Sequence, residues 1–199
     1  MHGEYTVKSR HELKQCYEEN ARTAYGKADV TFEYKRRNPF KKKLCEYYNL
    51  LRKYEYLCYL RDNCKNALKR KIICTQIKRT DIKKNKKGLE IGVEITPFFM
   101  RKPVRICHPN VIINGFVSGG CVFHGHNVIG DKKTGDKTAV PRIEKNVDIG
   151  AGAIIIGDIE IADGCIIGAG AVVTRSFTKP NCVIAGIPAK VISGESADE

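Results

Sequence analysis

The sequence lacks any apolar run long enough to cross a membrane, and its polar beginning, MHGEYTVKSRHELKQ, is unlike a cleavable signal peptide. Its nine cysteines form neither a paired framework nor a CxxC spacing. An odd number of thiols without a secretion signal predicts a chain of the reducing cytoplasm. Zinc-finger spacings and RNA-recognition signatures are also missing, so no motif points to nucleic-acid binding.

The excess of basic over acidic residues is confined to the first part of the chain. Residues 1–90 contain 24 Lys and Arg against 11 Asp and Glu, whereas residues 91–199 contain 11 of each. The 199 residues, 42% of them hydrophobic, suffice for one sizeable domain with a smaller appendage. A basic half is typical either of a solvated helix surface or of a surface that binds an anionic partner.

The basic half is predicted to be α-helical over residues 1–88. The segment SRHE (9–12) fits a capping box, which predicts a helix from there to about Gly26. Asn38-Pro39 predicts a second helix start, and a further helix is predicted after RDNCKN to about residue 82, with KKNKKG as a linker that ends at Gly88. The second helix carries a stripe of residues with packing spacing: Phe40, Leu44, Tyr47, Leu51, Tyr54 and Cys58.

After residue 88, isoleucine and glycine recur with a period of six, which neither a helix nor a strand explains. The motif IGAGA occurs at 149–153 and again at 167–171, eighteen residues apart, so three six-residue sides would close one triangular coil. Such repetition is a signature of the parallel β-helix. Two columns are expected to point inward: Ile143, Ile149, Ile155, Ile161, Ile167 and Val173, with Val147, Ala153, Ile159, Cys165, Ala171 and Phe177.

The same spacing extends upstream through Val117, Phe123 and Ile129. Ile143 follows Ile129 by fourteen residues, which is two more than the twelve residues of two repeat units. The polar segment GDKKTGDKTAVPR lies between them. This segment, residues 130–142, is predicted to be a loop extruded from the coil, and such loops often carry function. The β-helical domain is expected over residues 89–193 and a disordered tail over 194–199.

The repeats, the tail AGIPAKVIS (185–193) and the upstream ICHPN (106–110) together resemble the hexapeptide-repeat acyltransferases. The resemblance is to serine acetyltransferases, and especially to the serine-acetyltransferase-like proteins of bacterial polysaccharide gene clusters. It implies a mainly β fold, a left-handed parallel β-helix with an N-terminal α-helical region. It also implies a homotrimer with active sites between subunits, acetyl-coenzyme A as donor, no metal, and a hydroxyl acceptor, either serine or a sugar.

The resemblance also implies the catalytic residues. RICHPN places His108 at the position of the family's catalytic histidine, and VEITP places Glu94 at the position of its supporting carboxylate. A hydroxyl is a weak nucleophile until a base takes its proton, and histidine suits this role at neutral pH. A carboxylate on the far ring nitrogen would fix the tautomer of the histidine and stabilise the imidazolium.

Several departures from the family pattern fall on the acceptor side. The aspartate that contacts serine is replaced by Cys107, a second histidine is missing from AVPRI (139–143), the helical Asp pair is not recognisable, and residues 108–117 form a shorter segment. The resemblance therefore favours acetyl transfer more strongly than serine as acceptor. Similar polysaccharide-cluster proteins carry a histidine at the position of His124, which implies acceptor binding.

The donor side matches the family. Coenzyme A binding there uses backbone amides of the coil edge, and the small residues at this edge also suit tight corners. Two lysines would meet the phosphates or lie as plain surface residues. The implied donor-binding positions are Gly150, Ala151, Gly168, Ala169, Lys179 and Lys190.

Two other hypotheses from different classes remain open. His108, His124 and His126 resemble the zinc site of β-helical carbonic anhydrases, since a catalytic zinc needs three protein ligands. Alternatively, the chain is a non-catalytic adaptor whose basic helices bind an anionic surface, such as an acidic membrane or nucleic acid.

Overall fold

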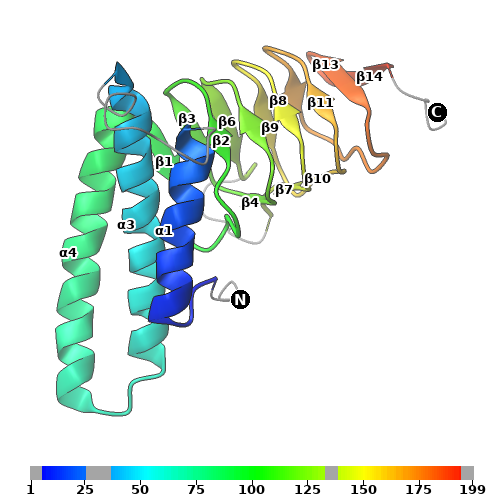
Figure 1. Cartoon of the computed structure of the whole chain (residues 1–199). Helices are drawn as coiled ribbons and strands as arrows, with labels where there is room; N and C mark the ends of the chain where they lie inside the picture. Colours follow the sequence, from blue (N-terminus) through cyan, green and yellow to red (C-terminus); the bar gives the residue numbers. More distant parts are fainter. Residues whose placement is uncertain (1–5, 26–36, 133–138, 194–199) are drawn as a thin grey trace. The chain divides into compact units, whose positions relative to one another are not determined.

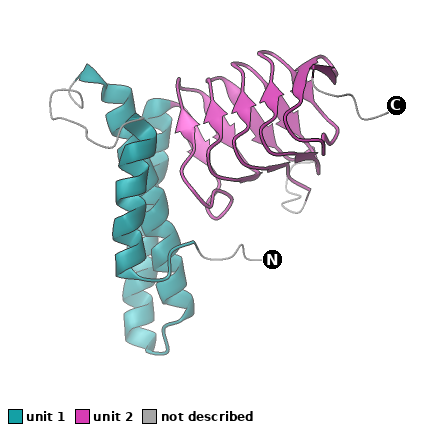
Figure 2. Ribbon diagram, turned by 45° about the vertical axis from the view of Figure 1, so that its right-hand side comes forward, with its two compact units in different colours: residues 1–91 teal, residues 92–199 magenta. Residues whose placement is uncertain are grey.

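The computed structural model describes residues 6–25, 37–132 and 139–193. The chain divides into two compact units, residues 1–91 and 92–199, coloured teal and magenta in Figure 2. Across these described ranges, no helix combines the length and apolar character needed to cross a bilayer.

The first unit is helical, with α1 (Arg10–Tyr25), α3 (Pro39–Asp62) and α4 (Ala67–Ile91), and α3 packs against both of the others (Figure 1). The predicted helix start is confirmed, because the Glu12 N–H donates to Ser9 Oγ at 3.1 Å. The second bond differs from a capping box, because the Glu12 carboxylate accepts from the Lys8 N–H at 2.6 Å, one residue before the N-cap residue Ser9. The predicted end near Gly26 lies outside the described residues.

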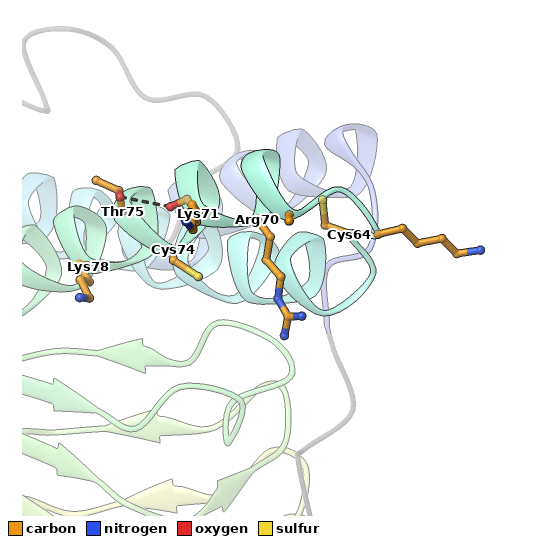
Figure 3. A pocket seen from close by; sticks show the side chains of 8 residues that line it. Cys64, Arg70, Lys71, Cys74, Thr75 and Lys78 are labelled. Carbon is orange, nitrogen blue, oxygen red and sulfur yellow. Dashed lines mark hydrogen bonds between the residues drawn. The ribbon is translucent and has the colours of Figure 1, made fainter.

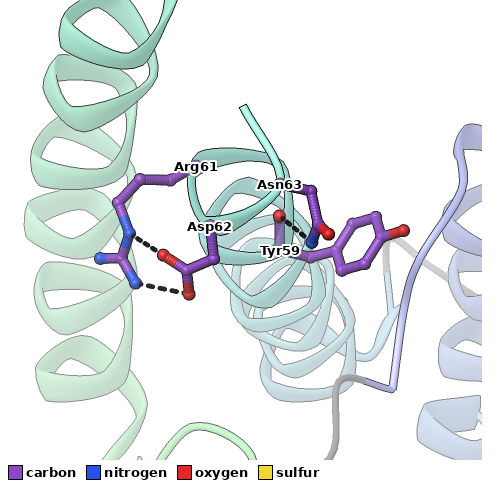
Figure 4. Close-up of polar contacts among 4 residues, drawn as sticks. All are labelled: Tyr59, Arg61, Asp62 and Asn63. Atoms are coloured by element: carbon purple, nitrogen blue, oxygen red, sulfur yellow. Dashed lines mark hydrogen bonds and ion pairs between the residues drawn. The ribbon is translucent and has the colours of Figure 1, made fainter. Parts of the chain in front are cut away.

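The start and the apolar stripe of α3 are confirmed. Asn38 is the N-cap residue before Pro39, although its side chain makes no capping hydrogen bond. Within the stripe, Leu44, Tyr47, Leu51 and Cys58 are buried. At the other end of the helix, the Asn63 side chain donates to the Tyr59 carbonyl at 2.9 Å and closes the last turn (Figure 4).

The predicted linker KKNKKG is wrong, because α4 continues through residues 83–88 to Ile91. Lysines are good helix formers, and here they are held by neighbours. Lys84 is buried, with its ammonium 3.2 Å from Asp81 and 5.4 Å from the centre of the Tyr54 ring. Lys87 reaches Glu46 of α3 at 3.0 Å. These contacts extend the face of α4 that packs on α3 beyond the predicted end near residue 82.

An ion pair is buried on α3. Arg52 Nη1 lies 2.7 Å from Glu55 Oε2, and the two side chains are 1% and 0% exposed. The Nε and Nη2 groups of Arg52 are buried without a hydrogen-bond partner among the described residues. A buried charge that loses its partner is expensive, so this pair is a sensitive point of the helical unit.

The second unit is a coil of short parallel strands that form three sheets. One sheet has the order β1-β3-β6-β9-β12, another β10-β7-β4, and the third β14-β13-β11-β8-β5-β2 (Figure 1). The last pair, β13 and β14, is antiparallel and contains AGIPAKVIS. The strands are β1 (Val93–Ile95), β2 (Arg105–Ile106), β3 (Val111–Ile113), β4 (Phe116–Val117), β5 (Val122–Phe123), β6 (Asn127–Gly130), β7 (Arg142–Ile143), β8 (Asp148–Ile149), β9 (Ile154–Ile156), β10 (Glu160–Ile161), β11 (Ile166–Ile167), β12 (Val172–Val173), β13 (Val183–Gly186) and β14 (Ala189–Ser193).

The six-residue period is confirmed as the repeat of the coil. Ile149 pairs with Ile167, Ile143 with Ile161, and Ile155 with Val173, so neighbours in each column are eighteen residues apart. Every residue of both predicted inward columns is buried. Stacked aliphatic columns therefore form the core of this unit.

The size of the inserted loop differs from the expectation. Ile129 lies on β6 and Ile143 on β7, which are consecutive sides of the coil. Equivalent residues on consecutive sides are normally six residues apart, whereas these two are fourteen apart. Accordingly, Val117 pairs with Ile143 across 26 residues, whereas Ile143 pairs with Ile161 across 18. The insertion thus contains eight residues rather than two, because the sequence alone does not show which side of the coil a strand occupies. Residues 133–138 of this loop and the predicted tail, 194–199, lie outside the described residues.

Candidate functional site

One corner of the coil brings together donor-side and acceptor-side positions that are far apart in sequence. Cys107, His124, Gly150 and Gly168 each follow a strand of the same sheet, and backbone hydrogen bonds of 2.8–3.0 Å join every one to the strand of the next coil. They occupy equivalent positions on consecutive coils. The predicted acceptor-binding and donor-binding residues therefore form one continuous column.

His108 lies at the next position of this corner, between β2 and β3, with its side chain exposed. The adjacent coil approaches it closely at Gly125, where a Cβ would lie 2.7 Å from the Cβ of His108. Gly125 also has a φ of +113°, which side chains rarely adopt. Glycine is thus required here to let the two histidine-bearing corners stack.

His124 forms a histidine–carboxylate pair that the sequence did not indicate. Its Nε2 lies 2.8 Å from Asp148 Oδ1, and both side chains are about half exposed. An ionised carboxylate only accepts hydrogen bonds, so in neutral His124 the proton lies on Nε2 and the Nδ1 lone pair is available. Asp148 thereby orients the ring of His124.

Glu94 lies on β1, which pairs with β3, while His108 lies three residues before the start of β3. The two residues are therefore on adjacent coils, as stacking of coils allows. Among the described residues, however, neither side chain takes part in a hydrogen bond or an ion pair. The predicted Glu94–His108 pair remains a prediction.

Asn127 holds two corners of the candidate site together, and the sequence analysis did not identify it. It is fully buried at a position where the repeat expects an aliphatic side chain. Its side chain accepts from the Gly125 N–H at 2.9 Å and donates to the Gly150 carbonyl at 2.7 Å. One buried amide therefore ties the histidine-bearing corner to the donor-side corner. A polar residue in the inward column was the available signal.

The small residues of the donor side have a packing reason. A Cβ on Gly150 would lie 2.5 Å from the Ala169 nitrogen, and one on Gly168 would lie 2.9 Å from the Ala185 Cβ. Ala151 and Ala169 are exposed on the same corner. Close stacking thus demands glycine at two positions, and the resulting edge presents a strip of methyl groups and backbone.

The two predicted phosphate-binding lysines lie on different parts of the C-terminal coil. Lys190 is exposed on β14, opposite Ala185 of β13. Lys179 is partly buried, and its carbonyl accepts from the Cys165 thiol at 3.4 Å. Both lie beyond Gly168 in the coil. Their role in phosphate binding stays a prediction.

The histidines of this corner do not form a cluster of metal ligands with other described residues. Within residues 6–25, 37–132 and 139–193, no group of three or more His, Cys, Asp or Glu side chains is arranged to hold a metal ion. His126 instead directs Nδ1 toward the Asn110 amide at 3.4 Å. Away from this corner, Cys121 lies between β4 and β5, where burial raises the pKa of its thiol to about 11 and keeps it protonated at neutral pH.

Comparisons with known proteins agree with this architecture. Residues 141–175 match the family described as bacterial transferase hexapeptide (six repeats). Over 82 residues the chain is 42% identical to a serine acetyltransferase of Buchnera aphidicola subsp. Schizaphis graminum, covering 41% of this chain and 30% of that protein. The chain thus spans less than a third of that relative's length.

Solved structures share the fold. Serine acetyltransferase of Neisseria gonorrhoeae superposes with a TM-score of 0.61 at 19% identity, covering 92% of this chain and 68% of that one. Serine acetyltransferase of Brucella abortus strain S19, in complex with coenzyme A, superposes with a TM-score of 0.51 at 16% identity, covering 95% and 71%. The second unit therefore carries the hexapeptide repeat of bacterial transferases on a left-handed parallel β-helix, the fold of the serine acetyltransferases that it resembles.

Proposed function

We propose that the chain is an acetyl-coenzyme A-dependent O-acetyltransferase, similar to serine O-acetyltransferase, that acetylates a hydroxyl of serine or of a surface-polysaccharide sugar. The observation that carries this proposal is the corner column, in which Cys107 and His124 continue into Gly150 and Gly168. Sequence similarity to a serine acetyltransferase, at 42% identity over 82 residues, supports it.

In the proposed reaction, His108 takes the proton of the acceptor hydroxyl as the oxygen attacks the thioester carbonyl. The carbon–sulfur bond then breaks, and the sulfur leaves as the thiol of coenzyme A after receiving a proton. An exposed His108 with no hydrogen-bond partner among the described residues has a free ring nitrogen for this step. Glu94, on the adjacent coil, would stabilise the imidazolium that forms.

The donor would lie along the strip formed by Ala151 and Ala169. These exposed methyl groups leave the backbone of the coil edge accessible, which suits an extended pantetheine arm. Lys179 and Lys190 would meet its phosphates. The B. abortus structure with coenzyme A supports this donor class for the fold.

A homotrimer with active sites between subunits is part of the proposal. Ile112 and Ile166 project aliphatic side chains from the outside of the coil into solvent. The two residues lie on different sheets of the coil, β3 and β11. A thin prism has much surface for its core, so burying such side chains against neighbouring subunits would stabilise it. All nine cysteines are free thiols, which supports the cytoplasm as the compartment.

The purified chain, mixed with acetyl-coenzyme A, is expected to release free thiol only when a suitable hydroxyl compound is added. Serine and a panel of amino sugars and hexoses should be tested, with mass spectrometry to locate an added acetyl group. The same compounds lacking the hydroxyl serve as controls. No acceptor-dependent thiol release across the panel would count decisively against the proposal.

Asp148→Asn is expected to raise the KM for the acceptor about tenfold, the effect of losing a charge-assisted hydrogen bond of about 1.4 kcal/mol. The KM for acetyl-coenzyme A should stay unchanged, because Asp148 acts through the ring of His124. His124→Ala should raise the acceptor KM at least as much, and Asp148→Glu should recover part of the loss. Equal changes in both KM values would instead indicate general disruption of the corner.

A further inference from the structure

The helix α4 has a second apolar face that is largely exposed to solvent. Four large aliphatic side chains on it are exposed: Leu68 by 70%, Ile72 by 53%, Ile82 by 68% and Leu89 by 87%. At about 100° per residue, they fall within one side of the helix, opposite Ile77, Thr80 and Lys84, which are buried. We refer to residues 68, 72, 82 and 89 as the outer apolar stripe.

Basic side chains surround this stripe. The helix α4 contains nine Lys and Arg against two Asp and Glu. Lys71, Lys78, Lys83 and Lys86 are exposed and form no ion pair with a described residue. Near the start of the helix, an open hollow of about 610 Å³ is lined by Lys65, Arg70, Lys71 and Lys78, among other residues (Figure 3).

This combination discriminates among partners. A second copy of α4 would bring two strongly basic faces together, and like charges flanking an apolar seam oppose pairing. Nucleic acid would match the charge, but its phosphate backbone would not bury the exposed Leu and Ile side chains, and α4 contains no aromatic residue on which bases could stack. Exposed Leu and Ile flanked by Lys and Arg are the pattern of a helix lying in a membrane interface.

We propose that the outer face of α4 docks the protein on a bilayer that contains anionic phospholipid. The outer apolar stripe enters the boundary between headgroups and acyl chains, while the surrounding lysines and the basic hollow contact lipid phosphates. The helix lies along the surface rather than across the bilayer, since it is too polar to span it. This docking is independent of acetyl transfer and would hold for an inactive chain.

The absence of tryptophan from the sequence makes a direct test possible. Ile72→Trp in the full-length chain introduces a single fluorophore into the outer apolar stripe. Its emission is expected to shift to shorter wavelength on vesicles of phosphatidylcholine with phosphatidylglycerol, and not on phosphatidylcholine alone. Ile192→Trp, at a similarly exposed aliphatic position of β14, is the matched control and should not shift. Shifts at both positions, or at neither, would overturn the proposal.

Two sets of substitutions separate the contributions in vesicle co-sedimentation. Leu68→Ser with Ile82→Ser, and separately Lys71→Gln with Lys78→Gln, should each weaken binding at least about tenfold, and added salt should weaken it further. Circular dichroism of each variant checks that the helices are retained. The proposal is wrong if the two lysine substitutions weaken binding to a DNA or RNA duplex while the two aliphatic substitutions leave vesicle binding unchanged. The outer face of α4 would then bind nucleic acid. The proposal is also wrong if the unsubstituted chain self-associates without binding vesicles and the aliphatic pair of substitutions abolishes that self-association. The outer apolar stripe would then bind a second copy of the chain.

Discussion

His108→Ala is expected to lower turnover at least about a hundredfold, the usual loss when a general base is removed. The exposed imidazole at the corner between β2 and β3 is the proposed proton acceptor, and alanine offers none. Binding of coenzyme A should barely change, because the donor is proposed to contact backbone on other coils. Steady-state kinetics and calorimetric titration with coenzyme A measure these two quantities separately.

Glu94→Gln is the companion variant and should cost less than His108→Ala, since Glu94 would stabilise charge without taking the proton. His124 is the alternative general base, because Asp148 already orients its ring as a carboxylate partner. If His124→Ala is inactive while His108→Ala turns over normally, His124 is the base. A His108→Ala enzyme with near-normal turnover therefore contradicts the mechanism even if acetyl transfer is confirmed.

Glu55→Ala is expected to destabilise the helical unit by about 3–5 kcal/mol. The substitution leaves the guanidinium of Arg52 buried without its 2.7 Å partner, and two of its nitrogens, Nε and Nη2, already lack acceptors among the described residues. The free energy of unfolding can be measured from the loss of helical circular dichroism in urea.

Two controls define this effect. Glu46→Ala removes an exposed partner of Lys87 and should cost less than about 1 kcal/mol. Replacing both members of the buried pair, as Arg52→Met with Glu55→Leu, should recover most of the lost stability, because no uncompensated charge remains. A Glu55→Ala protein as stable as the Glu46→Ala control would show that Arg52 finds another partner or water.

The β-helical unit was predictable because its signal is periodic. A residue that recurs every sixth position has one explanation, and the buried columns follow from it. The helix α4 was misread at residues 83–88 because a lysine-rich segment resembles a linker when its neighbours are unknown. The contacts of Lys84 with Tyr54 and of Lys87 with Glu46 come from a different helix, so no local pattern contains them.

The candidate site was predictable only in part. His108 and His124 were identified through resemblance, and the register explains why His124 is adjacent to the donor-side residues while His108 lies one coil further away. Asp148 was missed because it meets His124 across 24 residues that include an inserted loop, and that register depends on counting the sides of the coil correctly. Asn127 was available as a polar residue among aliphatic ones, but its two backbone partners appear only in three dimensions.

The insertion between β6 and β7 has a consequence for how such a chain can change over evolution. Eight additional residues leave the pairing of Val117 with Ile143 intact, and all later columns keep their inward positions. Length variation at a corner is therefore neutral for the scaffold, whereas one residue added within a strand would turn the buried side chains outward. Loops that border the site can lengthen, shorten or be exchanged between relatives while the coil beneath them is inherited unchanged.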